Sequence, residues 1–374
     1  MSVSEITRIR GYVVQPVDSP AVRFTGQDEL ETWSLELVRL TLRDGNEGVA
    51  GSATGWMGAE QGTLCREMEV LGKKVMGEDV RARTAITAKL LKEPREELPQ
   101  AESLFDVAMW DAYGHHVNAP LWQLLGGFRE TIPTYASTPA YLNVDEYLEI
   151  TQQCIDAGYR AIKFHMNCDS DFDLEMVQAV QKTFPDSGLR FMVDLEQRYQ
   201  FDAAVHLGRA LSKLPYDWME APFADTDLDS YIELNRIVGI DVLPAGNSLI
   251  GLKKWAEALG RRAWSRLRCD ANNAGGITTL CQAMALAEAH GVKNEIQSWG
   301  FPISQFSNLH VMLGLPGCSW FEFPFPAHYF GYGAKNPLRL DAQGCVRAHE
   351  GAGLGIEMDW ERIETDACVT FDLR

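Results

Sequence analysis

The sequence lacks the features that mark membrane-spanning, zinc-binding and nucleic-acid-binding proteins. No apolar run approaches the ~20 residues that span a bilayer, and the eight cysteines form no CxxC pair and no Cys/His spacing typical of zinc. Lys and Arg number 34 against 52 Asp and Glu, which gives a formal net charge of −18 and too little basic surface to offset phosphate charge. No cleavable signal precedes the first strand-like run. We therefore expect a soluble, cytoplasmic protein with reduced thiols and with neither a nucleic acid nor a membrane as partner.

Hydrophobic patterning changes once along the chain. Residues 5–55 alternate apolar and polar positions, which predicts an antiparallel meander, and a helical region follows to about Gln123. From Ile132 onward strand-like runs alternate with helical periodicity; the runs are IPTYAS, AIKFHM, LRFMVDL, DWMEAP, DVLPAG, RLRCDA, NEIQSW and WFEFP. Eight such units predict a parallel (β/α) barrel. The segment from about 340 to 374 is strand-like again, and we expect it to return to the N-terminal domain.

Three of these strands end in an oxygen-bearing side chain. Asp194 ends the run FMVD, Glu220 lies in WMEAP, and Asn247 lies in VLPAGNS. In a barrel of parallel strands the functional groups lie where the strands end, and hard cations such as Mg²⁺ are held by carboxylate and carbonyl oxygens. The spacing leaves room for one helix between successive ligands, so the pattern predicts a metal site. A lone acid is usually a surface residue, but Asp194 and Glu220 both end apolar runs.

Several motifs in this order resemble the enolase superfamily, in its mandelate racemase/muconate lactonizing enzyme branch. They are LFDVAMWDAYGHHVNAPLWQLLGG, the KFH of the second barrel strand, the Asp194/Glu220 pair, DANNAGGIT and WFEFP. The resemblance covers essentially the whole chain. It implies an α/β fold made of an α+β capping domain, expected at 1–130 and completed by about 340–374, and a (β/α)7β TIM-type barrel at 131–339. It also implies one Mg²⁺ and removal of the proton α to a substrate carboxylate.

The resemblance assigns the metal to Asp194, Glu220 and Asn247, and Asn247 is a departure. The family usually has Glu or Asp there, whereas Asn offers a neutral carbonyl oxygen and a weaker attraction for the ion. The alternative is that Asn247 caps the following helix while water completes the coordination. We favour direct ligation.

Lys163 and His165 are the second departure, because the family commonly has Lys-X-Lys at these positions. Side chains two apart on a strand point to the same face, so both are expected to project into the barrel near the metal. Beside an ammonium and a divalent ion an imidazole should stay neutral and serve as a base. We predict His165 as the catalytic base and Lys163 as the contact to the substrate carboxylate.

The opposite face of the site differs from both kinds of relative. Enzymes resembling mandelate racemase pair a His after the seventh strand with an Asp after the sixth, and the lactonizing enzymes carry a Lys on the sixth. This chain has Asp270 and Gln297 there, and Gln takes up no proton at useful pH. Two-base racemisation is therefore disfavoured. Asp270 either binds a substrate hydroxyl, contacts Gln297 or anchors its loop.

Further substrate contacts are expected from the last barrel strand and from the capping domain. Glu322 in WFEFP matches a family acid that contacts the substrate carboxylate when protonated, and His328 and Tyr329 are candidate proton donors in the same loop. Two capping loops are expected to choose the substrate. They contain Arg23, which would pair with a distal oxygen, and Trp56 with Met57, which would wall the pocket.

Together these residues predict a Mg²⁺-dependent dehydratase of an acid sugar or another hydroxy carboxylate. His165 removes the α-proton, and the β-hydroxyl leaves as water. The alternatives are an epimerase, racemase or cycloisomerase of the same superfamily, or a non-catalytic binding protein on the same fold. The expected partner is a small carboxylate substrate, and the expected assembly is a homo-oligomer.

Overall fold

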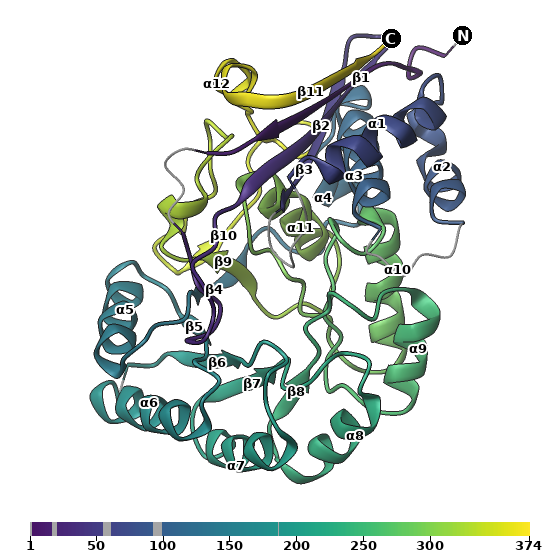
Figure 1. The fold of residues 1–374 in the computed structure, drawn as a ribbon. Coiled ribbons are helices and arrows are strands. Elements are labelled where there is room, and N and C mark those ends of the chain that lie inside the picture. The colour runs from purple at the N-terminus through teal and green to yellow at the C-terminus, as the bar shows by residue number, and fades with distance from the viewer. Residues whose placement is uncertain (1, 17–20, 55–60, 93–98, 186) are drawn as a thin grey trace.

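The computed structural model describes residues 2–16, 21–54, 61–92, 99–185 and 187–374. An antiparallel sheet with helices stands beside a barrel of parallel strands, and both chain termini lie at the antiparallel sheet (Figure 1). The predicted fold class, an enolase-type barrel with an N-terminal capping sheet, is therefore confirmed.

The capping sheet has the strand order β11-β1-β2-β3. Its strands are β1 (Ile6–Val14), β2 (Ser34–Leu42), β3 (Glu47–Thr54) and β11 (Ala367–Leu373). The C-terminal strand β11 pairs antiparallel with β1, so the end of the chain does return to the capping sheet. The associated helices are α1 (Thr63–Val75), the 3₁₀ turn η1 (Val80–Ala82), α2 (Arg83–Leu90), α3 (Gln100–His116) and α4 (Leu121–Leu124).

The barrel strands run parallel in the order β9-β4-β5-β6-β7-β8. They are β4 (Ile132–Thr138), β5 (Ala161–His165), β6 (Arg190–Asp194), β7 (Tyr216–Glu220), β8 (Asp241–Leu243) and β9 (Phe321–Pro324). Helices flank them on the outside (Figure 1): α5 (Val144–Asp156), α6 (Ser170–Thr183), α7 (Phe201–Leu211), α8 (Leu228–Ile237), α9 (Leu252–Gly260), α10 (Gly276–Ala289) and α11 (Pro302–Gly314).

Two expected barrel strands are irregular. The segments RLRCDA and NEIQSW form no ladder in the described chain, only an isolated parallel bridge between Leu267 and Asn294. Glu295 N donates to Leu267 O at 2.9 Å, so the two segments still lie side by side. The Asp270 carboxylate accepts the backbone N–H groups of Asn272 and Asn273, which turns the chain there and ends the pairing.

The remaining elements connect the two domains. The short strand β10 (Cys345–Val346) pairs antiparallel with β4 of the barrel. The 3₁₀ turn η2 (Ala327–Phe330) follows β9, and α12 (Trp360–Asp366) precedes β11.

The barrel strands alternate between two environments. In β5, Ile162 and Phe164 join the large core beneath the outer helices, whereas Ala161 belongs to a small cluster with Tyr135, Met192, Trp218 and Leu243. The small cluster fills the barrel interior with apolar side chains. Lys163 and His165 point to the same side as Ala161, so they stand above this layer and at the carboxyl end of the strand.

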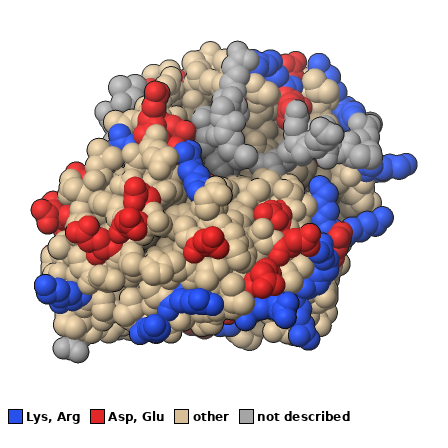
Figure 2. Space-filling view, turned by 60° about the horizontal axis from the view of Figure 1, so that its bottom comes forward, with Lys and Arg blue, Asp and Glu red and all other residues tan. Residues whose placement is uncertain are grey.

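The exterior carries charges of both signs. On the face shown in Figure 2, acidic and basic side chains are interspersed among neutral residues, and no continuous basic surface is seen there.

Among the residues that the structure covers, no helix combines the length and the apolar character needed to cross a membrane.

Candidate active site

A cavity of ≈ 270 Å³ lies at the carboxyl ends of the barrel strands and is lined by residues of both domains. Strand register brings three of the expected residues to one level, because His165 pairs with Asp194 and Asp194 pairs with Glu220. The expected residues that line the cavity are Lys163, His165, Asp194, Glu220, Asn247, Asp270, Gln297 and Glu322. The structure thus places most of the predicted site in one pocket.

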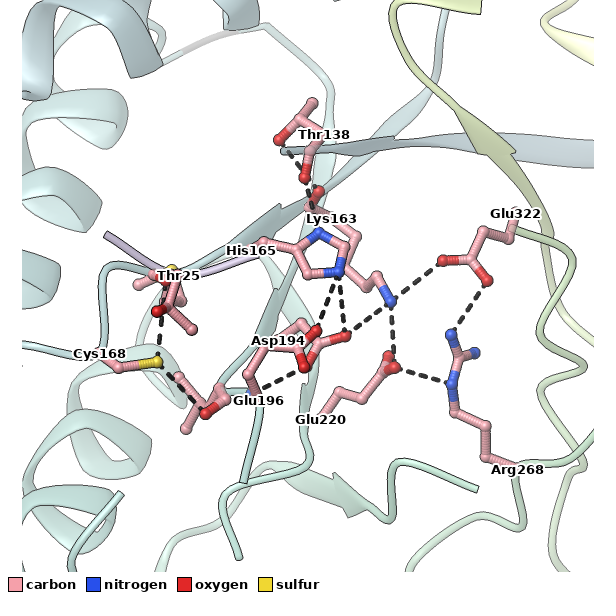
Figure 3. A network of polar contacts seen from close by, with 12 residues as sticks. Thr25, Thr138, Lys163, His165, Cys168, Asp194, Glu196, Glu220, Arg268 and Glu322 are labelled. Atoms are coloured by element: carbon pink, nitrogen blue, oxygen red, sulfur yellow. Dashed lines mark hydrogen bonds and ion pairs between the residues drawn. The ribbon is translucent and has the colours of Figure 1, made fainter. Parts of the chain in front are cut away.

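Lys163 stands at the centre of the pocket floor (Figure 3). Its Nζ lies 2.9 Å from Asp194 Oδ2, 3.0 Å from Glu220 Oε1 and 3.1 Å from Glu322 Oε1. Burial by itself would lower the pKa of Lys163, but the three carboxylates raise it well above its ordinary value. Lys163 is therefore held as an ammonium and is unsuited to act as a base.

Arg268 is a second buried cation that the sequence analysis missed. Its Nε lies 2.8 Å from Glu220 Oε1, and its Nη2 lies 3.0 Å from Glu322 Oε2. Burial would raise the pKa of Glu322, but Lys163 and Arg268 lower it well below its ordinary value. Two buried cations thus favour the ionised form of Glu322, and its expected contact to a substrate carboxylate stays a prediction.

His165 has a fixed tautomer. Its Nδ1 lies 2.6 Å from the backbone carbonyl of Thr138, and a carbonyl only accepts, so Nδ1 carries the proton and donates it. Nε2 lies 3.3 Å from Glu196 Oε1 and 3.6 Å from Asp194 Oδ2. Burial would lower the pKa of His165, but these two carboxylates raise it overall. Glu196, one of these two carboxylates, was not among the residues predicted from the sequence.

A buried carboxylate positions Asn247. The side chain of Asp225 accepts the backbone N–H groups of four consecutive residues, Ala245 to Ser248, at 2.7–3.3 Å. Gly246 takes a positive φ of 76°, and a Cβ there would lie 2.4 Å from Arg268 O, so the loop requires glycine. Asn247 is almost fully buried, and its Oδ1 has no hydrogen-bond partner in the described chain.

Two sets of side chains in this pocket are suited to a metal ion. The expected set of Asp194, Glu220 and Asn247 supplies oxygen atoms only, which suits Mg²⁺, and the unpartnered Asn247 oxygen is consistent with a ligand position. A second set shares Asp194 and adds His165 and Glu196, whose ligand atoms all lie within 4.8 Å of one another. An imidazole in the set favours transition metals over Mg²⁺. The second set is the one whose ligand atoms the structure brings together, and the assignment of Mg²⁺ to the oxygen-only set stays a prediction.

The opposite wall carries amides and one carboxylate. Asp270 accepts Asn273 Nδ2 at 2.8 Å in addition to two backbone N–H groups, so it anchors its loop. Burial raises the pKa of Asp270 to about 6. Gln297 lines the same wall, and no partner is found for its buried Oε1 among the described residues.

Two other expected contacts, Arg23 and His328, lie elsewhere. Arg23 donates from Nε to the backbone carbonyl of Asp28 and is not among the described cavity-lining residues. His328 is exposed and lies against the ring of Tyr329, away from the cavity lining. Trp56, together with Met57, lies outside the described residues.

An aromatic wall that was not predicted from the sequence stands beside His165. The ring of Phe24 lies 5.4 Å from the imidazole of His165 and 5.3 Å from the ring of Trp299. The ring of Trp33 contacts those of Phe24 and Trp299. Phe24, Trp33 and Trp299 all line the cavity. Arg268 could have been predicted from the sequence, because it is two residues before Asp270 and side chains two apart on a strand point to the same face. No local pattern marks Phe24 or Glu196.

A capping sheet packed beside a parallel barrel, with acids at the ends of successive strands, defines an enolase-type enzyme class. Two family descriptions match the chain: the enolase C-terminal domain-like family over residues 146–362 and the mandelate racemase/muconate lactonizing enzyme N-terminal domain over residues 13–126. The protein belongs to the enolase superfamily, in its mandelate racemase/muconate lactonizing enzyme branch.

Curated relatives catalyse different reactions. A 3,6-anhydro-alpha-L-galactonate cycloisomerase of Streptomyces coelicolor is 30% identical over 70% of this chain and 71% of its own. An N-succinylamino acid racemase of Thermus thermophilus is 28% identical over 87% and 88%. An L-talarate/galactarate dehydratase of Salmonella typhimurium is 26% identical over 74% and 71%. The reaction type therefore does not follow from these similarities.

Solved structures share the fold over nearly the whole chain. A protein of Pseudovibrio sp., provisionally assigned to the mandelate racemase/muconate lactonizing enzymes, is 31% identical and covers 100% of both chains with a TM-score of 0.95. A mutant of the Salmonella dehydratase, liganded with Mg and L-glucarate, has a TM-score of 0.87 at 22% identity, covering 98% of this chain and 93% of its own.

Proposed function

We propose that the protein is a Mg²⁺-dependent dehydratase of an acid sugar or a related hydroxy carboxylate. The single observation that carries the proposal is the pairing of one available base, His165 Nε2, with an amide, Gln297, across the same cavity. A base on one face alone suits elimination better than racemisation through two opposed bases.

The charge of the pocket floor supports a metal ion and one carboxylate group. Two buried cations, Lys163 and Arg268, face three carboxylates, which leaves one net negative charge when all are ionised. A divalent cation and a substrate carboxylate together add one positive charge and make the floor neutral. Asp194, Glu220 and Asn247 would hold the ion, which supplies Lewis-acid stabilisation to the enediolate when bound.

The chain's own residues account for the proton transfers. Lys163 is held as an ammonium and binds the substrate carboxylate. The Nδ1–H group of His165 stays hydrogen-bonded to Thr138 O, and Nε2 takes the α-proton. The β-carbon–oxygen bond then breaks with its electron pair on oxygen, and the imidazolium returns that proton so that the hydroxyl leaves as water. Phe24, at 5.4 Å from the imidazole, shields the base from solvent.

The test follows the α-proton directly. A panel of acid sugars is incubated in D₂O with Mg²⁺, and α-deuterium and 2-keto-3-deoxy product are measured. We expect exchange for only one α-configuration. The variant His165→Asn should lose about 10²–10⁴ in exchange rate with binding largely kept, whereas Lys163→Met should weaken binding and turnover together. The exposed His206 offers a matched control as His206→Asn.

Two results would contradict the proposal. Near wild-type exchange in His165→Asn would place the base elsewhere, and deuterium entering both epimers at comparable rates would favour an epimerase.

Cycloisomerisation is the second candidate, favoured by the 30% identical cycloisomerase. It needs the same α-proton transfer by His165 but loses no water. Mass analysis of the product separates it from dehydration, since a cycloisomerase product has the mass of its substrate.

A further inference from the structure

The mouth of the cavity is formed by a capping-domain segment that lies over the barrel. Val22 and Glu31 pair as an antiparallel bridge, which brings Asp28 and Glu31 to the cavity lining. Glu196 and Arg198, which follow β6, line the cavity from the barrel side. These four residues supply three carboxylates and one guanidinium to the cavity lining, and the Glu196 carboxylate lies 3.3 Å from His165 Nε2.

The single guanidinium is already paired. Arg198 Nη2 donates to Asp28 Oδ1, and the other oxygen, Oδ2, accepts Thr25 N at 2.9 Å. Asp28 is therefore held from both sides, and its charge cancels that of Arg198. Glu31 and Glu196 remain as acids, and burial together with the nearby Asp28 and Glu196 carboxylates raises the pKa of Glu31.

No other described Lys or Arg lines the mouth. Apart from Arg198, the only lysine or arginine among the described cavity-lining residues is Lys163, which is buried in the floor. The stretches 17–20 and 55–60 lie outside the described residues, and their sequences, VDSP and GWMGAE, contain no Lys or Arg. They supply no cation that could receive a second substrate carboxylate.

We propose that the substrate has one carboxylate, bound at the floor, and an uncharged hydroxyl-bearing tail at the mouth. It is a monocarboxylic aldonate and not a dicarboxylic aldarate, because a distal carboxylate would meet Glu31 and Glu196 with no free cation. Like charges brought together in this way disfavour the wrong partner. This inference rests on the proposed acid-sugar function and narrows its substrate class.

The test compares matched pairs that differ only at the distal carbon, such as D-gluconate with D-glucarate and D-galactonate with galactarate. Binding to the Mg²⁺-loaded full-length protein is measured by calorimetry and by thermal stabilisation. In each pair with a binding member, we expect the diacid to bind about tenfold or more weakly than the monoacid at low salt, with a smaller difference at high salt.

Three variants test whether the charges at the mouth cause the preference for the monoacid. Glu31→Gln and Asp28→Asn should each improve diacid binding relative to monoacid binding several-fold, since one removes a negative charge and the other frees Arg198. The control Glu29→Gln removes an acid from the same segment at an exposed position outside the described cavity lining and should leave the ratio unchanged. Arg198→Gln leaves Asp28 without its cation and should weaken diacid binding further relative to monoacid binding.

A diacid that binds as tightly as its monoacid overturns the inference, and so does a panel in which no monoacid binds. Monoacid preference without α-proton exchange would instead keep this inference and contradict the proposed dehydratase. Exchange and product formation with diacids alone would keep the dehydratase and contradict the monocarboxylate class.

Discussion

Glu220, like Glu322, is a carboxylate that Lys163 and Arg268 share. Its Oε1 lies 3.0 Å from Lys163 Nζ and 2.8 Å from Arg268 Nε, and all three side chains are almost fully buried. Buried charges persist only where partners compensate for lost hydration. Glu220 therefore serves two purposes, as an expected metal ligand and as one of the anions that stabilise two buried cations in the barrel.

Substitutions of Glu220 and of Asn247, two expected metal ligands, should therefore differ in their effect on stability. Glu220→Ala should reduce Mg²⁺ affinity and also lower the free energy of unfolding by about 3 kcal/mol, because two buried cations lose an anion. Asn247→Ala should reduce affinity less and change stability by under about 1 kcal/mol, since its Oδ1 has no described partner to lose. Calorimetric Mg²⁺ titration and urea unfolding measure the two effects. Equal destabilisation by both substitutions would mean that Asn247 has a structural role.

At the scale of elements, the turn after β8 depends on a side chain from another loop. Asp225 lies between β7 and α8, yet it accepts four backbone N–H groups around Asn247 and the hydroxyl of Ser248 at 3.1 Å. Because β8 is short, the backbone N–H groups that follow it are satisfied by this carboxylate instead of by a neighbouring strand. It fixes where Asn247 can present its amide oxygen.

Asp225→Ala is therefore expected to weaken Mg²⁺ binding by about 10–100-fold, as changes behind metal ligands do. Asp227 on the same loop provides the control. It caps α8 by accepting Ser230 N, so Asp227→Ala should cost about 1 kcal/mol of stability and leave Mg²⁺ affinity unchanged. Calorimetric titration of both variants with Mg²⁺ measures the difference. Similar affinities for the two variants would argue against a positioning role of Asp225.

At the scale of the molecule, buried polar side chains join the capping elements to the barrel. Asp106 of α3 accepts Thr278 N of α10 at 2.9 Å, and a Cβ on Gly276 would lie 2.2 Å from the same carboxylate. The GG of DANNAGGIT thus permits α3 to approach α10. His310 of α11 makes another link, because Trp122 N donates to its Nδ1 at 3.0 Å and its Nε2 lies 2.9 Å from Leu354 O.

His310 predicts a pH dependence of stability. Burial lowers its pKa to about 4, against about 6.5 in the unfolded chain. Between these values the unfolded chain binds a proton that the folded chain does not, so the contribution of His310 to stability is lost as pH falls from 6.5 to 4. Urea unfolding should show wild type losing roughly 3 kcal/mol more than His310→Gln over this range. The exposed His290, as His290→Gln, should keep the wild-type slope, and parallel profiles for wild type and His310→Gln would contradict the prediction.

Patterns within the sequence were enough to predict the barrel, the capping sheet and the residues at the strand ends. Periodicity and strand alternation are local properties, so they place Lys163 and His165 on one face and Asp194 and Glu220 at the ends of neighbouring strands. The shared level of those ends follows from parallel pairing, which the pattern of alternating strands and helices also predicts. The roles of Asp270 and Gln297 and the identity of the metal ligands stay predictions.

The surroundings of these residues come from tertiary packing. Asp225 and the segment carrying Phe24, Asp28 and Glu31 reach the pocket from elements distant in the chain, which no local pattern records. Neighbours in space, such as Glu196 beside His165 and Arg268 beside Glu322, shift the pKa values of these groups. Electrostatic effects depend on distance and burial in three dimensions. The sequence therefore predicts the candidate catalytic groups but not the charges that surround them in the folded protein.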